Sequence, residues 1–300
     1  MNPELETALK RIRGSQPLNL IATSAMATAF AVTRTRSEFV FKHLPRVGTV
    51  HRRMPNGRTL SLWSRGDDWV SNRIYWRGWD GYEPETVSLF FRLATRAAVT
   101  LDVGAYVGYY TLIAAHANPN GVVHAFEPLP AIHQRLLRNI RLNGLKNVAC
   151  IASAVGDADG QARFFHVDAE LPTSSSLSHE FMRPTPGLVS STVSVTTLDR
   201  YLANRAIPKV NLVKIDTEST ESQVIRGMRN TIERDHPDIF CEVLQGRADT
   251  RALEEILGPL GYHYYLLTPA GAVEHDDIEG HPEWLNYLFS TVAPSVVSVL

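Results

Sequence analysis

The stretch from Ala97 to Pro128 constrains the fold of this chain more than any other, because it joins two strand patterns through a glycine turn and a helix. Residues 98–103 form a short run rich in β-branched and apolar side chains, which is typical of a strand buried on both faces. Gly104 and Gly108 then bracket a tight turn, and a helix-compatible run follows until an Asn-Pro-Asn-Gly stop. A second strand ends on Glu127. This order predicts a parallel α/β sheet.

An acidic residue at the tip of the second strand indicates what kind of ligand this sheet binds. Ligands of open α/β sheets bind beyond the carboxyl ends of the strands, where the turn exposes helix N–H groups. There Glu127 can accept both hydroxyl protons of a ribose, and Asp102, at the end of the first strand, can meet an ammonium group. The stretch therefore predicts a nucleoside ligand with a free ribose. The alternative is an ordinary βαβ unit in which Glu127 is an incidental surface residue.

The residue in the middle of the turn narrows the choice of nucleoside. A dinucleotide fingerprint has a glycine there, which lets the backbone approach a pyrophosphate, but this chain has Tyr106. No Gly-Lys-Ser/Thr phosphate loop occurs anywhere in the sequence. A ligand with a ribose and no phosphate fits better, and S-adenosylmethionine is such a ligand. We expect Gly104 to allow close backbone approach to its amino-acid end, with its carboxylate at the N-terminus of the helix after Gly108.

Five sequence blocks together resemble one family: LDVGAYVGYYT, HAFEP, TLDRYL, VNLVKIDTESTESQVIRGM and NYLFS. Over roughly residues 76–290 the chain resembles the FkbM family of S-adenosylmethionine-dependent methyltransferases. The resemblance implies a Rossmann-like class I methyltransferase fold, an α/β fold with a seven-stranded, mostly parallel sheet and helices on both faces. The alternation of strands and helices, with a closing antiparallel pair, predicts the same sheet. Tyr106 stands where the family usually has Asn, and Ser219 stands where it usually has Gly.

The chain divides into an N-terminal appendage and a larger domain. Residues 1–80 predict helices and short strands, including strand character near residues 57–63, and residues 81–300 form the methyltransferase-like domain. Residues 18–33 are mildly apolar and follow a basic stretch, which superficially resembles a signal peptide. Threonines and a serine dilute this segment, and it is too short to span a bilayer. The sequence therefore favours a packing helix and no stable membrane span.

Two segments after Glu127 bear on the ligand. Residues 148–155 predict the third strand, so the backbone from Ala154 to Asp157 is expected beside an adenine if the ribose lies on Glu127. A role in turn formation is the alternative for Asp157. Residues 168–191 are rich in Ser and Pro and poor in apolar residues, which predicts either a lid over the substrate or a simple surface loop.

The overall composition limits the partners and the compartment. The formal net charge is −1, so nothing indicates broad electrostatic binding to nucleic acid. The two cysteines, Cys150 and Cys241, lie in apolar strand-like runs. Two buried thiols in a chain of this size predict a reducing compartment and a cytoplasmic protein without a disulfide framework.

Methyl transfer to a hydroxyl requires a group that takes the hydroxyl proton. The candidates are Asp216 and Glu218, at the end of the fourth predicted strand, and Asp199, at the start of a helix. Glu242 ends the neighbouring strand, so Asp216 and Glu242 are able either to hold Mg²⁺ or to line a polar cleft. We expect no metal, because no further Asp or Asn follows Glu242 closely. The resemblance implies O-methylation of a hydroxyl on a sugar or secondary metabolite, with a small-molecule or glycan acceptor.

Two other functions stay open on the sequence alone. A nucleotide-sugar or NAD(P)-dependent oxidoreductase shares the βαβ layout, although Tyr106 and the lack of a Tyr-x-x-x-Lys pair disfavour it. A non-catalytic S-adenosylmethionine-binding protein is compatible with Ser219 in the glycine position.

Overall fold

The computed structural model describes residues 3–33, 37–169, 171–172, 175–183 and 185–293. Contacts between residues divide the chain into two compact units. The first unit contains Met1–Glu83 and Arg141–Gly144, and the second contains Pro84–Ile140 and Leu145–Leu300. Within the described ranges, no helix combines the length and the apolar character needed to cross a membrane.

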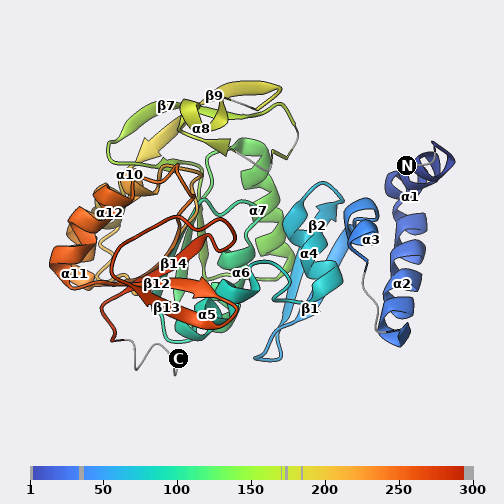
Figure 1. The fold of residues 1–300 in the computed structure, drawn as a ribbon, viewed down its shortest axis with the longest axis horizontal. Coiled ribbons are helices and arrows are strands. Elements are labelled where there is room, and N and C mark those ends of the chain that lie inside the picture. Colours follow the sequence, from blue (N-terminus) through green and yellow to red (C-terminus); the bar gives the residue numbers. More distant parts are fainter. Residues whose placement is uncertain (1–2, 34–36, 170, 173–174, 184, 294–300) are drawn as a thin grey trace. The chain divides into compact units, whose positions relative to one another are not determined.

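The first unit consists of four helices and a β-hairpin: α1 (Pro3–Gly14), α2 (Gln16–Thr33), α3 (Glu38–His43), β1 (Val47–Arg53), β2 (Thr59–Arg65) and α4 (Trp69–Arg77) (Figure 1). Side-chain caps fix where two of these helices begin. Ser37 accepts a hydrogen bond from the N–H of Val40 in α3, and Asp68 accepts one from the N–H of Ser71 in α4. The predicted strand character near residues 57–63 is confirmed as β2, and the expected helix over residues 18–33 as α2.

The second unit is built on an eight-stranded sheet in the order β13-β12-β14-β11-β10-β3-β4-β5. On one side of the sheet lie β3 (Val99–Val103), β4 (Val122–Phe126) and, at the edge, β5 (Val148–Ile151). In the other direction β3 is followed by β10 (Leu212–Ile215), β11 (Asp238–Glu242), β14 (Asn286–Ser290), β12 (His263–Thr268) and β13 (Gly271–His275). The strands from β5 to β11 are parallel, whereas β14, β12 and β13 pair antiparallel. The predicted Rossmann-like, mostly parallel sheet is confirmed.

The sheet has one strand more than the expected seven. The additional strand is β13, which forms a hairpin with β12 through a tight turn in which Gly271 has φ +111°. Four of its five residues are exposed, and it pairs only through β12 at the edge of the sheet. A short, solvated edge strand lacks the apolar run by which the other strands were recognised.

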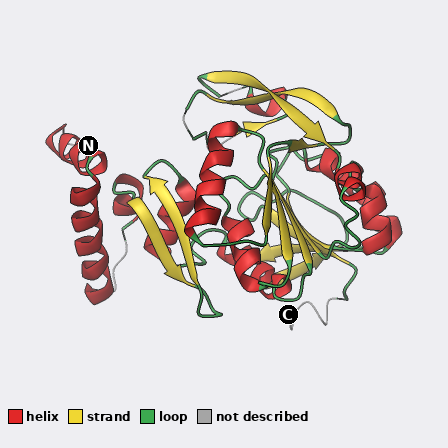
Figure 2. Cartoon of the chain, turned by 180° about the vertical axis from the view of Figure 1, so that it is seen from behind, coloured by secondary structure: helices red, strands yellow, loops and turns green. Residues whose placement is uncertain are grey.

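Helices cover both faces of this sheet (Figure 2): α5 (Pro84–Ala94), α6 (Tyr109–Ala117), α7 (Pro130–Leu142), α9 (Leu198–Asn204), α10 (Glu221–Arg226), α11 (Arg229–Asp235), α12 (Thr250–Leu257) and a 3₁₀ turn η1 (Gly258–Leu260). On one face, residues of α9 to α12 form a buried core with the side chains that alternate along the strands, including Leu101, Val213 and Ile239. On the opposite face, Phe90 of α5 packs against Phe240 of β11, with ring centroids 5.3 Å apart.

A second sheet of four strands lies after β5, in the order β6-β9-β7-β8. It contains β6 (Ala154–Val155), β7 (Gly160–Val167), β8 (Ser175–Ser176) and β9 (Leu188–Thr196). The short helix α8 (His179–Met182) lies between β8 and β9 in the chain. The third strand was predicted over residues 148–155, but it ends at Ile151, and β6 pairs with β9 instead. The segment 168–191, predicted as a loop, includes β8, α8 and the start of β9 among its described residues.

Candidate active site

The turn after β3 has a backbone that requires glycine at its first position. Gly104 has φ +82°, and a Cβ atom there would lie 1.8 Å from the carbonyl oxygen of Asp216. The close approach expected at Gly104 is therefore made by the end of strand β10, which packs directly against the turn. Gly108 has φ +93° and precedes α6, and its missing Cβ leaves room for Leu136. The turn is thus held from two sides.

Glu127 follows β4 and lies against this turn. Its side chain is 4% exposed, and its carboxylate accepts hydrogen bonds from two backbone N–H groups, those of Tyr106 (3.2 Å) and Leu129 (2.8 Å). Tyr106 has φ +50°, which aims its N–H at Glu127. Burial raises the pKa of Glu127 to about 7, although both hydrogen bonds oppose the rise. The carboxyl group is therefore poised to ionise near neutral pH.

Asp102 occupies the centre of the same edge of the sheet. Its side chain is buried and accepts a hydrogen bond from the Thr111 hydroxyl of α6. Burial raises the pKa of Asp102 to about 6, and Thr111 and Lys214 both act against that rise. Asp102 and Glu127 thus place two buried carboxyl groups at the ends of adjacent parallel strands.

Polar side chains continue across the next strands as a row that we call the acceptor-side row: Lys214, Asp216, Glu242 and Asn286. Lys214 pairs in register with Asp102, so both side chains lie on the sheet face covered by α6. The Lys214 Nζ atom lies 3.4 Å from an Asp216 carboxylate oxygen and donates to Asn286 Oδ1 at 3.0 Å. It also lies 5.3 Å from the ring centroid of Tyr110. These contacts compensate the desolvation cost of burying the Lys214 ammonium group, because the residue is only 1% exposed.

Glu242 is the least satisfied carboxyl group of this row. It is buried, it pairs in register with Asn286, and its Oε2 atom has no hydrogen-bond partner among the described residues. Burial, followed by the negative charges of Asp216 and Glu218, raises the pKa of Glu242 well above its usual value. Burial thus favours the protonated form of Glu242, beside the half-buried carboxylates of Asp216 and Glu218.

The loop from Asp216 to Glu221 carries backbone strain. Glu218 and Ser219 have φ +56° and +78°, the left-handed region that favours glycine. The buried carboxylate of Glu221 accepts from the N–H groups of Thr217 and Ser219 and from the Thr217 hydroxyl, which holds the loop in this shape. Glycine adopts such a backbone without steric cost, whereas Ser219 adopts it despite its side chain.

A residue from the second sheet also supports the same loop. The hydroxyl of Ser176, in β8, is buried and donates to the carbonyl oxygen of Glu218 at 2.6 Å. Segment 168–191 therefore contacts the rim where Glu218 lies.

The structure separates Asp199 from the other candidate bases. Its two carboxylate oxygens accept hydrogen bonds from the N–H groups of Asn230 and Thr231 and from the Thr231 hydroxyl, at 2.6 to 3.0 Å. Asp199 thus caps helix α11, and each of its oxygens accepts at least one hydrogen bond. The role of Asp199 as a base stays a prediction, and these hydrogen bonds give the same carboxylate a capping role as well.

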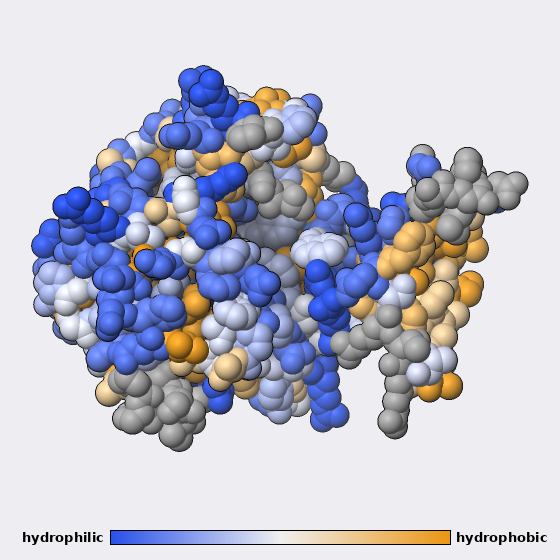
Figure 3. Space-filling model, in the orientation of Figure 1, coloured by the Kyte–Doolittle hydropathy of each residue, from blue (hydrophilic) through white to orange (hydrophobic). Residues whose placement is uncertain are grey.

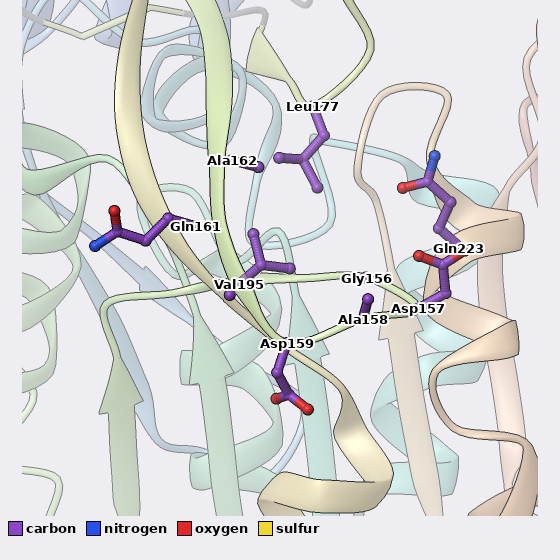
Figure 4. Close-up of a pocket in the computed structure, with 10 residues that line it drawn as sticks. Gly156, Asp157, Ala158, Asp159, Gln161, Ala162, Leu177, Val195 and Gln223 are labelled. Carbon is purple, nitrogen blue, oxygen red and sulfur yellow. The ribbon is translucent and has the colours of Figure 1, made fainter.

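The two residues expected beside an adenine lie along the second sheet. Ala154 is buried in β6, and Asp157 faces Arg226 at 3.7 Å. Asp157 also lines a pocket of about 290 Å³, which Figure 4 shows between the β7–β9 ribbon and helix α10. In that view Leu177 and Val195 point toward the pocket, and Gln223 borders it from α10.

Sequence reasoning did not identify four residues of this edge: Thr111, Lys214, Glu221 and Asn286. Lys214 gave a signal, because it is the one charged residue in an otherwise apolar strand. Asn286 gave none, because its place opposite Glu242 depends on how β14 pairs with β11. Among the described residues, no group of three or more His, Cys, Asp and Glu side chains is arranged to hold a metal ion.

Three comparisons place the chain among known proteins. Residues 102–289 match the family model of the Methyltransferase FkbM domain. The chain is 27% identical over 245 residues to 31-O-demethyl-FK506 methyltransferase FkbM of Streptomyces tacrolimicus, covering 70% of this chain and 86% of that protein. It is 29% identical over 152 residues to hexuronic acid methyltransferase AglP of Haloferax volcanii, covering 50% of this chain and 58% of that protein.

For a further relative and for a solved structure, the match covers a smaller part of the other protein. Methyltransferase 1 of Beauveria bassiana is 27% identical over 165 residues, which is 50% of this chain and 65% of that protein. The crystal structure of Methyltransferase FkbM from Methylobacillus flagellatus is 16% identical with a TM-score of 0.45, covering 75% of this chain and 55% of that chain. The chain thus spans less than two thirds of several relatives that it matches. The family model nevertheless covers more than half of the chain, and the chain belongs to the FkbM methyltransferase family.

Proposed function

We propose that this chain is an S-adenosylmethionine-dependent methyltransferase that methylates a hydroxyl group on a sugar or secondary metabolite. The observation that carries the proposal is Glu127, a buried carboxyl group at the end of β4 that is hydrogen-bonded to the turn after β3. Family membership supports methyl transfer as the reaction. Two relatives, a 31-O-demethyl-FK506 methyltransferase and a hexuronic acid methyltransferase, support a hydroxylated acceptor.

The residues of the turn fit this cofactor. Each Glu127 oxygen accepts one backbone N–H, so each keeps a lone pair for a ribose hydroxyl. Asp102, a buried carboxyl group at the end of β3, suits an ammonium group. Gly104, Tyr106 and Gly108 supply a tight turn in front of α6. No phosphate-binding glycine stands at the position of Tyr106, which is consistent with a ligand that has no phosphate.

The pocket beside Asp157 supports an adenine position near Ala154 and Asp157. Its lining mixes the apolar side chains of Leu177 and Val195 with polar groups, as in many sites for flat heterocycles. Asp157 already faces Arg226 and forms its ion pair at the surface, so its backbone is the better contact to a base. This part of the proposal rests on the ribose assignment, because the backbone from Ala154 to Asp157 is expected beside an adenine only if the ribose lies on Glu127.

On the acceptor side, Asp216 is the residue we propose as the base. When bound, S-adenosylmethionine would supply an activated methyl group on a sulfonium. The Asp216 carboxylate would accept the proton that the acceptor hydroxyl loses on methylation. Lys214 and the end of β10 hold Asp216 in place, so the enzyme mainly aligns the two reactants. Glu218 lies two residues further along the rim and is the second candidate.

Glu242 suits a different role beside that base. A protonated carboxyl group is a hydrogen-bond donor, and an acceptor molecule with several hydroxyl groups offers oxygens for it to contact. Such a contact would orient a second oxygen of the acceptor while Asp216 removes the proton. The oxidoreductase alternative has no support in the family to which the chain belongs.

The test is to incubate the purified protein with methyl-labelled S-adenosylmethionine and panels of glycosides, uronic acids and hydroxylated metabolites. We expect S-adenosylhomocysteine to form only when an acceptor is present, with the label on an acceptor oxygen. Titration with NAD and with S-adenosylmethionine distinguishes an oxidoreductase from a methyltransferase. Cofactor binding without turnover on any acceptor, in cell extract as well as in the panels, would instead favour the non-catalytic binding protein.

A further inference from the structure

Helix α2 of the first unit is an unusual surface helix. Its 18 residues include no charged side chain. Most of them are solvent-exposed, and the large apolar ones are strongly so: Leu18, Ile21 and Val32 expose 48%, 66% and 78% of their surface. Helices that lie on a protein surface normally carry charged residues on the solvent side, whereas a helix that is apolar all round is usually covered. In Figure 3 apolar residues gather over the N-terminal helices.

The side of α2 that faces its own unit is occupied by polar contacts. Asn19 is fully buried, donates to the carbonyl oxygen of Pro45 at 2.9 Å and accepts from the N–H of Val47 at 2.7 Å. Thr23, also fully buried, accepts from Arg46 at 3.2 Å. These bonds fix the rotation of the helix. Phe30 adds an apolar contact on the same side, with its ring centroid 5.8 Å from those of Phe41 and Trp76. The large apolar side chains of Leu18, Ile21 and Val32 are left on the outward side.

The outward side is continuous. Positions 18, 21, 25, 28 and 32 repeat at intervals of three and four residues, so they lie along one side of the helix, and all five are exposed. They carry Leu, Ile, Ala, Thr and Val. An 18-residue helix is about 27 Å long, so this side is an extended apolar strip. We call these five positions the α2 strip.

The charges that flank the strip have one sign. Lys10, Arg11 and Arg13 precede α2 in the sequence, and Arg34 and Arg36 follow it. No Asp or Glu occurs between Lys10 and Ser37. Two copies of α2 that paired along their strips, parallel or antiparallel, would bring basic ends together. A surface that is both apolar and negatively charged complements the strip and its flanks at once.

From the α2 strip and its basic flanks we propose that α2 binds in the plane of an anionic membrane surface. The strip would enter the boundary between headgroups and acyl chains, while the flanking basic residues meet anionic headgroups. The helix lies in the plane because its inner side is already bound to Pro45, Arg46 and Val47. This interaction is independent of the proposed methyl transfer and uses only residues of the first unit.

The test is co-sedimentation of the full-length protein with vesicles. Vesicles of phosphatidylcholine alone are compared with vesicles of phosphatidylcholine and phosphatidylglycerol in equal amounts. We expect binding to the anionic vesicles only, and we expect high salt to weaken it, because the Debye length falls from about 10 Å at 0.1 M to about 3 Å at 1 M. Equal binding to both vesicles, or none to either, would overturn the proposal.

Matched variants locate the contact. Ile21→Glu places a charge in the strip and is expected to weaken vesicle binding at least about tenfold. Val273→Glu is the control, because Val273 is an exposed apolar residue of β13 in the second unit and should leave binding unchanged. The double variant Arg11→Gln/Arg13→Gln tests the basic flank without touching the strip, and it should also weaken binding. Circular dichroism of each variant confirms that the helices are retained.

The competing occupant of the strip is a second copy of the chain. Sedimentation velocity without vesicles measures that directly. A dimer that Ile21→Glu dissociates, combined with no vesicle binding, would replace the membrane proposal with a homodimer interface. A monomer that binds anionic vesicles supports the proposal. Neither result depends on whether the protein transfers methyl groups.

Discussion

The two halves of the site are built in different ways. On the cofactor side, Glu127 and the turn after β3 meet through backbone N–H groups, and Asp102 meets Thr111 nine residues away. On the acceptor side, Lys214, Asp216, Glu242 and Asn286 come from three strands that are distant in sequence. The first half is fixed by local geometry, whereas the second depends on strand register and on side-chain partners.

This difference separates two kinds of function. A cofactor used for every turnover suits a preformed cradle whose backbone donors cannot be altered by a side-chain change. The acceptor-side row contains one buried carboxyl oxygen without a hydrogen-bond partner among the described residues, that of Glu242. A buried carboxyl oxygen without a hydrogen-bond partner suits contact with the acceptor molecule. Substitutions in the two halves should therefore affect different measured quantities.

The largest expected effect is on turnover, from Asp216→Asn. A general base contributes typically about 10²–10⁴ in rate, so turnover should fall by at least about a hundredfold. The amide is nearly isosteric and keeps the backbone contact with Gly104, so cofactor affinity should stay within about threefold, a change under 1 kcal/mol. Steady-state kinetics and calorimetry measure the two quantities.

Glu218→Gln is the matched control on the same rim. Its carbonyl oxygen, which Ser176 contacts, is untouched by the change. We expect a smaller loss of turnover than for Asp216→Asn. The assignment of the base to Asp216 fails if Asp216→Asn lowers turnover by less than about tenfold. It also fails if Glu218→Gln lowers turnover more than Asp216→Asn does.

The next effect concerns pH and the cofactor side. Burial raises the pKa of Glu127 from 4.5 to about 7, so the folded protein binds more protons than the unfolded chain between those values. Glu127 therefore contributes stability at low pH that is lost as the pH rises from about 4.5 to about 7. Without cofactor, the melting temperature of the wild type should fall relative to Glu127→Gln over this range. A difference between the two proteins that is constant from pH 5 to pH 8 would contradict the raised pKa.

The same division explains what the sequence could and could not predict. The order of strand, turn and helix around Glu127 follows from local patterns, because glycine positions and apolar runs report backbone geometry directly. The cap role of Asp199 was missed because α11 begins thirty residues later in the chain, where sequence alone gives no distance. The contact of Asn286 with Lys214 depends on how the antiparallel strand β14 is placed in the sheet. The predicted third strand ends early because residues 154–155 pair with β9 in the second sheet, which local sequence does not reveal.

A smaller effect is expected in the strained loop of the acceptor side. Ser219 has φ +78°, where a side chain costs about 1–2 kcal/mol, and its hydroxyl oxygen is buried with no hydrogen-bond partner among the described residues. Ser219→Gly removes both penalties and should raise the free energy of unfolding by about 1 kcal/mol after the entropy cost of glycine. Ser219→Ala keeps the strain and removes only the hydroxyl, so it should gain less. Chemical denaturation of the three proteins measures this, and a destabilised glycine variant would show that the loop is not strained.

The smallest expected effect is that of chelation. Thorough treatment with a chelator should leave turnover unchanged, and added Mg²⁺ should not increase it, because Lys214 already neutralises part of the negative charge beside Asp216. Steady-state rates before and after metal removal provide the measurement. Loss of activity that Mg²⁺ restores would instead make Asp216 and Glu242 metal ligands.

The most direct test of the cofactor assignment is calorimetric titration of S-adenosylmethionine into the wild type, Glu127→Ala and Asp216→Asn. Glu127→Ala removes hydrogen bonds to a charged group that are worth about 1.5–3 kcal/mol each, so its affinity should fall by at least about tenfold. Asp216→Asn, which changes only the acceptor side, should bind like the wild type. A folded Glu127→Ala protein that binds S-adenosylmethionine as tightly as the wild type would contradict the assignment of Glu127 to the ribose, and with it the proposed cofactor site.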